Sequence, residues 1–82
     1  MTPRLRRLYS PRPVQVETGP DNVPASLDGV AVESVRERWA VDDRWWEVES
    51  LRRHYFELAL ADGRAVVVFR DLVSGRWYRQ RA

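Results

Sequence analysis

Cysteine, lysine and isoleucine are absent from this chain, and histidine and methionine occur once each. Without cysteine the chain can form no disulfide and no thiolate metal site. Its apolar residues never form a run near the roughly 18 that a membrane-spanning helix needs. The N-terminus also lacks the apolar stretch of a signal peptide. We therefore expect a cytoplasmic protein that makes no contact with a membrane.

The residues that are present are typical of one small globular domain. The chain has 82 residues, of which 44% are hydrophobic and 32% charged, and domains usually have about 50 to 250 residues. A chain of this length buries only about 60% of its unfolded surface, so its core must be compact. We predict a single β domain over residues 13–82. A flexible basic arm over residues 1–12 precedes it, because prolines there separate too few apolar residues to pack.

All fourteen basic residues are arginines, a pattern typical of a G+C-rich genome, so their number says little about function. Their distribution is more informative. The net charge is +4 over residues 1–16, −6 over residues 17–49 and +4 over residues 50–82. The acidic middle argues against one broad basic face. The opposite charges of the last two segments leave a homodimer open.

Alternating apolar and polar residues predict short strands in the first half of the chain. Val14 and Val16 indicate the first strand, and a loop rich in turn-forming residues follows over 18–22. Asp28 and Gly29 lie between two apolar stretches, which predicts a hairpin turn.

The stretch 32–39 fits helical as well as strand spacing. Its neighbours are strand-like, and no N-cap residue precedes a clean helical stripe. We therefore favour a long strand that has a bulge near Ser34 and ends at residues 42–43.

The second half contains a clearer hairpin. Residues 54–61 and 64–71 flank Asp62 and Gly63, the pair preferred in a two-residue type I′ turn. Such a turn places residue 58 opposite residue 67 and residue 56 opposite residue 69. One face of the hairpin would then be the core, with Glu57 pointing to solvent on the other. The predicted core residues are Phe56, Leu58, Leu60, Ala65, Val67 and Phe69.

A third strand over residues 76–81 follows a loop at 72–75. This loop length places Tyr78 opposite Phe69 on the core face and Trp77 opposite Arg70 on the outer face. Together the patterns predict an all-β fold, a small and strongly bent antiparallel sheet or barrel of five or six strands.

Residues suited to catalysis are sparse. His54 is the only histidine, and no serine lies in a glycine-rich elbow, so His54 is better interpreted as a partly exposed structural residue. The carboxylates at 42–43 and 47–49 lack the loop of converging oxygens that a calcium site needs. The four glycines stand singly instead of forming a phosphate-binding loop. We expect no enzyme activity, no metal and no cofactor.

The aromatic residues offer a binding surface instead. Trp45 and Trp46 are adjacent, so on a strand they point to opposite faces. We place Trp46 inward and Trp45 outward, where it is either covered by the N-terminal arm or open to a partner. On the outer face, Tyr55, Arg70 and Trp77 are expected to form an aromatic and guanidinium ladder. The alternative is that Trp77 fills the core.

Several short motifs lie along most of the chain: Trp39, the pair at 45–46, and the segments 53–58, 71–72 and 75–78. Together they resemble a small bacterial domain family of the form W…WW…R-x-Y-[YF]…G…D-L…G-x-W-Y, over residues 13–81. That family has no assigned chemistry. It occurs beside, or appended to, Y-family DNA polymerase-like proteins of mutagenesis cassettes. The resemblance implies a context of DNA repair by translesion synthesis and a polymerase-related protein as partner.

Two functions fit these observations. A protein-interaction module would use aromatic and arginine anchors, which dominate binding hot spots, and the predicted anchors are Trp45, Tyr55, Arg70, Trp77, Arg79 and Arg81. A nucleic-acid-binding domain would stack bases on the aromatic rings and hold phosphates with arginines, among them Arg4, Arg6, Arg7 and Arg12 of the basic arm. The acidic middle segment leads us to favour the protein-interaction module and to keep DNA as the alternative.

Overall fold

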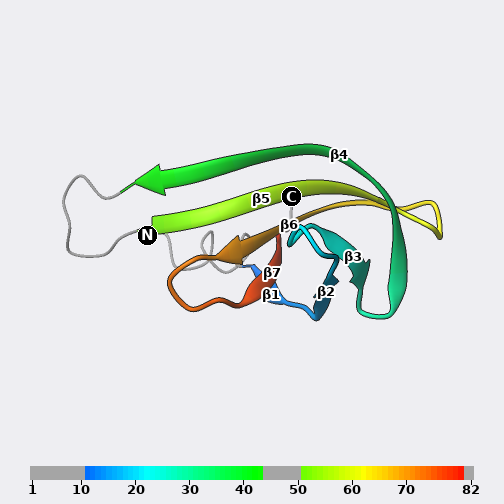
Figure 1. Ribbon diagram of the computed structural model, residues 1–82, viewed down its shortest axis with the longest axis horizontal. Helices are drawn as coiled ribbons and strands as arrows, with labels where there is room; N and C mark the ends of the chain where they lie inside the picture. Colours follow the sequence, from blue (N-terminus) through cyan, green and yellow to red (C-terminus); the bar gives the residue numbers. More distant parts are fainter. Residues whose placement is uncertain (1–10, 44–50, 81–82) are drawn as a thin grey trace, which may run out of the picture.

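The computed structural model describes residues 11–43 and 51–80, and all regular structure in these residues is β-strand. The two longest strands, β4 and β5, run side by side as bent ribbons, with shorter strands below them (Figure 1). No helix occurs among the described residues, and so none there could cross a membrane. The strands are β1 (Arg12–Pro13), β2 (Val16–Thr18), β3 (Pro24–Leu27), β4 (Val30–Asp43), β5 (Leu51–Leu60), β6 (Ala65–Asp71) and β7 (Trp77–Gln80).

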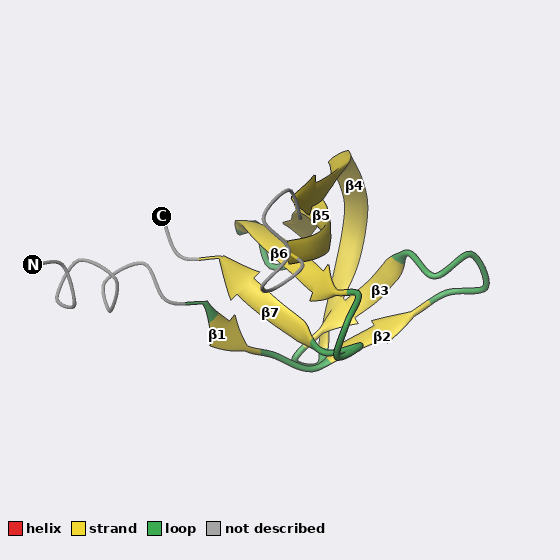
Figure 2. Cartoon of the chain, turned by 90° about the vertical axis from the view of Figure 1, so that its left-hand side faces the viewer, coloured by secondary structure: helices red, strands yellow, loops and turns green. Residues whose placement is uncertain are grey.

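The strands form one antiparallel sheet in the order β1-β7-β6-β5-β4-β3-β2. Its two outermost strands, β1 and β2, are separated in the chain only by Val14 and Gln15. The sheet therefore curls until its ends meet (Figure 2). The Val14 N–H donates to the Trp77 carbonyl at 3.2 Å, and the Asp28 N–H donates to the Gln15 carbonyl at 2.8 Å. These bonds join the two ends of a small half-barrel.

The predicted all-β class and the strong bend of the sheet are confirmed. The number of strands is seven instead of five or six. The difference arises at the N-terminal end, where one strand was expected. The chain there changes partner from β7 to β3 within a few residues, and so it contributes two short strands.

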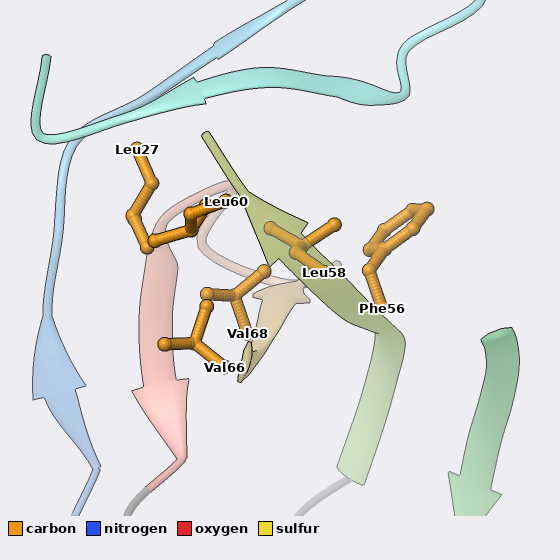
Figure 3. Packing of buried hydrophobic residues seen from close by; sticks show 6 residues of the cluster. All are labelled: Leu27, Phe56, Leu58, Leu60, Val66 and Val68. Atoms are coloured by element: carbon orange, nitrogen blue, oxygen red, sulfur yellow. The ribbon is translucent and has the colours of Figure 1, made fainter. Parts of the chain in front are cut away.

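The hydrophobic core lies on one face of the sheet, which we call the inner face. It is built mainly from β5 and β6 and is capped by a leucine of β3. Half-buried valines from β2, from β4 and from the connection between β1 and β2 pack around it, together with Trp77. Figure 3 shows the central cluster, whose members are Leu27, Phe56, Leu58, Leu60, Val66 and Val68.

The two loops of the N-terminal half follow the sequence prediction. Asp28 and Gly29 join β3 to β4 with φ angles of 48° and 85°, as a type I′ turn requires. In the loop before β3, the Gly19 N–H donates to the Val23 carbonyl at 2.9 Å, and the Asn22 N–H donates to the Gly19 carbonyl at 3.0 Å. The first turn is also held from outside, because the Asp28 Oδ1 accepts a hydrogen bond from the Gln15 N–H at 2.9 Å.

β4 is the long, bulged strand that the sequence predicts. Its register with β5 shifts near Ser34, as expected, and shifts again at Arg36. The second bulge adds one residue to β4, which reverses the faces of the side chains beyond it. Val35 therefore packs against the core, whereas Trp39 lies on the opposite face of the sheet, which we call the outer face.

The loop between β5 and β6 has three residues instead of two. The Gly63 N–H donates to the Leu60 carbonyl at 3.0 Å, and the Leu60 N–H donates to the Arg64 carbonyl at 2.8 Å. Gly63 has a φ of 93°, whereas Asp62 does not have a positive φ. This pattern is a type I turn followed by a left-handed glycine, and the type I′ prediction is wrong.

Asp62 holds this loop in shape. Its Oδ1 accepts the Arg64 backbone N–H at 3.1 Å, and its Oδ2 accepts the Arg64 Nε–H at 2.9 Å. The backbone hydrogen bond from Arg64 is the main reason that the pKa of Asp62 lies below its usual value, and the guanidinium adds to the effect.

The extra loop residue shifts the register of the hairpin by one. Leu58 lies opposite Val66, and Phe56 lies opposite Val68. The β5 half of the predicted core is confirmed, because Phe56, Leu58 and Leu60 are all buried.

The predicted face of the β6 residues is wrong, because a shift of one residue turns every side chain to the other face, although Phe69 is buried as predicted. Val66 and Val68 fill the core in place of the predicted residues. Glu57 lies on the outer face as expected, but it is half-buried there instead of fully exposed. The residues that the sequence assigned to the core and that lie on the outer face are Ala65, Val67 and Phe69.

The pairing of β6 with β7 is as predicted. Tyr78 lies opposite Phe69, and Trp77 lies opposite Arg70. However, Tyr78 and Trp77 each lie on the face opposite to the predicted one, because the register of β6 with β5 has shifted by one residue. Tyr78 is on the outer face, whereas Trp77 is on the inner face and packs against the core.

Candidate functional site

Four aromatic rings form a continuous row across the outer face. One ring comes from each of the strands β4 to β7, and each residue lies directly opposite the next. The ring centroids are 5.2 Å apart between Trp39 and Tyr55, 5.0 Å between Tyr55 and Phe69, and 5.3 Å between Phe69 and Tyr78. These separations are close to the spacing of neighbouring strands, about 4.8 Å. We call these four residues the aromatic row.

Arg53 covers the middle of the aromatic row. Its Cζ lies 4.3 Å from the centroid of the Phe69 ring, and its Nη1 donates a hydrogen bond to the Tyr55 hydroxyl at 3.0 Å. A guanidinium over a ring face is attracted by the quadrupole of the ring. Phe69 is consequently only 1% exposed, although it lies on the outer face and not in the inner-face cluster.

The rings of the row use their faces to contact one another. Trp39 and Tyr55 are parallel to within 5°, and Phe69 and Tyr78 are within 23° of parallel. Little ring face in the middle of the row remains for a ligand. The exception is Trp39 at the end of the row, which is 40% exposed.

Trp39 also lies on an open edge of the sheet. β4 pairs with β5 along most of its length, but it pairs with β3 only at Val30 and Ala31. Over residues 34–41, its other edge pairs with no strand in the described part of the chain. An edge of this kind presents unpaired backbone N–H and C=O groups to a partner.

Two carboxylates lie beside the exposed indole. Glu37 is directly opposite Glu57 on the outer face, one pleat away from Trp39 and Tyr55. Neither carboxylate has an ion-pair partner among the residues that the structure describes. Like charges in opposed positions of a sheet repel each other, so this part of the surface favours an incoming cation.

The predicted ladder of Tyr55, Arg70 and Trp77 does not form. Tyr55 belongs to the aromatic row, but Arg70 and Trp77 lie on the inner face, where the Trp77 ring is 5.7 Å from the ring of Phe56. The register shift separates them. Arg79 is half-buried opposite Val68, on the inner-face side of β7.

The remaining predicted anchors are distributed differently. Arg12, expected in the flexible arm, lies in β1 opposite Arg79. The others lie outside the residues that the structure describes: Trp45, Arg81, Arg4, Arg6 and Arg7.

Sequence reasoning missed three members of the row: Trp39, Phe69 and Tyr78. Part of the row could have been found from the sequence. The pairing of Phe69 with Tyr78 was predicted correctly, and placing Tyr55 opposite Phe69 would have extended the row to three rings. A three-residue loop at 61–63 would have given that pairing. In the described ranges 11–43 and 51–80, no three histidine or acidic side chains cluster as metal ligands.

Comparisons with known proteins add no relative to this picture: no family model, no curated protein and no solved structure matches the chain. The resemblance to the polymerase-associated domain family therefore stays a prediction.

Proposed function

We propose that the chain is a non-catalytic protein-interaction module that binds through the outer face of β4 and β5, centred on Trp39. The observation that carries this proposal is the 40% exposed indole of Trp39, stacked on Tyr55 at an open strand edge. Tryptophan is enriched among the residues that dominate protein interfaces. A ring that its neighbours already hold in place loses little conformational entropy when a partner binds.

The surface favours a partner segment in extended conformation. Such a segment can add to the open edge of β4 through backbone hydrogen bonds, and its alternate side chains then lie on the outer face. One of these side chains would contact the open side of Trp39. A basic side chain nearby would meet Glu37 and Glu57, which face each other without a counter-charge among the described residues.

Nucleic acid is the second candidate, because proteins that bind single strands stack bases on aromatic side chains. Two observations weigh against it on this face. Each of the two middle rings, Tyr55 and Phe69, already stacks on the outer ring beside it. Phosphates near Trp39 would also meet the charge of Glu37 and Glu57.

The resemblance to the polymerase-associated family suggests the first partner to test, a Y-family polymerase-like protein of the host. The tagged chain and its Trp39→Ala variant are used to capture that protein, and the affinity is measured on the purified pair. We expect Trp39→Ala to weaken binding by about 30-fold, corresponding to a hot spot of about 2 kcal/mol. Val73→Ala is the matched control, because Val73 is 68% exposed and lies in the turn after β6.

Two further measurements separate protein from DNA binding. Amide exchange over residues 34–41 should slow in the protein complex, because a strand added to the edge protects those N–H groups. The double variant Glu37→Gln, Glu57→Gln should weaken the protein complex but leave DNA binding unchanged. Nanomolar DNA binding with a steep salt dependence, or equal protein binding by the Trp39→Ala and Val73→Ala variants, would reverse the proposal.

A further inference from the structure

A second feature lies on the inner face, beside the core. It is a pocket of about 240 Å³ between β4, β5, β6, β7 and the loop that precedes β3. Three basic side chains line it, one from each of three neighbouring strands: Arg38, His54 and Arg70. The aromatic rings of Phe56 and Trp77 also line the pocket.

The pairing of the strands brings these basic side chains together. His54 lies directly opposite Arg70, and Arg38 lies opposite Phe56, the residue two positions along from His54. All three therefore share the inner face: His54 is directly opposite Arg70 and diagonal to Arg38, whereas the two arginines lie on strands separated by β5 and line the pocket from either side. The pocket thus brings two guanidinium groups and an imidazole to one surface, a set of hydrogen-bond donors that favours an anion between them.

The part of the chain that the structure describes supplies little negative charge to this pocket. Among the described residues, Asp21 is the only acidic side chain that lines it, and Arg38, His54 and Arg70 make no ion pair there. The Nε of Arg70 is shielded from solvent and has no hydrogen-bond acceptor. Arg53 also has an unbonded Nε, but its guanidinium rests on the Phe69 ring. In the described residues, the Arg70 guanidinium has no such ring contact to make up for the missing hydrogen bond of its Nε.

We propose that this pocket binds the phosphate group of a small phosphomonoester. Arg38, His54 and Arg70 would donate hydrogen bonds to its oxygens, since guanidinium groups match phosphate geometry. A dianion balances two guanidinium charges, whereas a carboxylate balances one. The volume is below the roughly 300 Å³ at which pockets for drug-sized ligands begin, so the ligand is small. Phe56 and Trp77 provide an apolar wall for the group attached to the phosphate.

The pocket and the aromatic row lie on opposite faces of the sheet, and so the two proposals can fail independently. Binding is measured by NMR titration of the whole chain with inorganic phosphate, a sugar phosphate and a nucleoside monophosphate at constant ionic strength. Shift changes are expected at His54 and Arg70. The nucleoside monophosphate should bind more tightly than the sugar phosphate if its base contacts Trp77, and equally if only the phosphate is recognised.

The variants test which residues hold the anion. Arg70→Gln and Arg38→Gln should each weaken phosphate binding at least tenfold, whereas Asp21→Asn should strengthen it. Arg64→Gln is the matched control, because Arg64 lies in the turn after β5 and its charge is paired with Asp62. Arg38 and Asp21 are exposed, so their variants keep the test valid if Arg70→Gln does not fold. Equal shifts with chloride, or equal affinity of Arg38→Gln and Arg64→Gln, would overturn the proposal.

Discussion

Replacing Phe69 by leucine tests whether the aromatic row stabilises the fold as a unit. The substitution keeps an apolar side chain but removes the ring contacts to Tyr55 and Tyr78 and the guanidinium contact from Arg53. Each aromatic pair contributes about 0.5 to 1.5 kcal/mol, and a cation over a ring adds about 0.5 to 2 kcal/mol. The three losses predict a decrease of about 1.5 to 5 kcal/mol in the free energy of unfolding. That is a large share of the roughly 4 to 12 kcal/mol expected for a domain of this length.

Urea unfolding followed by far-ultraviolet circular dichroism measures this decrease, and the slope of the transition should not change. Val67→Ala is the control, because Val67 lies two positions along β6 on the same face, is half-buried and carries no ring. It should cost about 1 kcal/mol or less. The double variant with Tyr78→Leu should show a coupling of about 0.5 to 1.5 kcal/mol between the two rings. A Phe69→Leu loss no larger than that of Val67→Ala would refute the idea that the row acts as a unit.

Three other variants test the core and the loop after β5. Leu58→Ala should lower the free energy of unfolding by about 2 to 5 kcal/mol in the same denaturation experiment, because Leu58 is fully buried; a loss below about 0.5 kcal/mol would contradict the core assignment. Gly63→Ala should cost about 1 to 2 kcal/mol, because the φ of 93° is unfavourable for alanine, and an unchanged thermal midpoint would argue against this loop. The carboxylate of Asp62, with a folded-state pKa below the usual 3.8, should contribute stability above about pH 4, and this contribution should disappear as the pH falls through the folded-state pKa. NMR titration should find that Arg64→Ala leaves most of the pKa lowering in place, because the backbone N–H of residue 64 remains.

The residues of β6 explain why the sequence predicted the hairpin but not its register. Asp62 and Gly63 mark a turn, yet the same pair occurs in two-residue and three-residue loops. Normally the alternation of apolar and polar residues would decide between them. Residues 65–69 are all apolar, so both faces of β6 fit a core equally well. The loop length was decided by backbone hydrogen bonds that composition does not reveal.

The prediction of the candidate site depended on the length of the same loop between β5 and β6. Tyr55 was placed on the outer face correctly, because β5 alternates clearly between apolar and polar residues. Its neighbours on β6 and β7 followed the wrong register, and so the predicted ladder contained Arg70 and Trp77. Trp39 lies on the outer face, and so in the aromatic row, because of a second bulge at Arg36. A single sequence does not indicate this bulge. The pocket between Arg38, His54 and Arg70 also needed the correct register, since each residue comes from a different strand.

The closure of the sheet by β1 and β2 has a consequence for synthesis. Residues 12–18 are synthesised well before residues 77–80, which form one of their partners, β7. At about 5 to 20 residues per second, this interval lasts roughly 3 to 12 s. The hairpins of β4, β5 and β6 contain local contacts and can form earlier. Until β7 has been made and pairs with β6, the inner face of the sheet formed by β4, β5 and β6 stays exposed at the β6 edge. Chaperones that shield nascent apolar surface therefore have a defined interval in which to act on this chain.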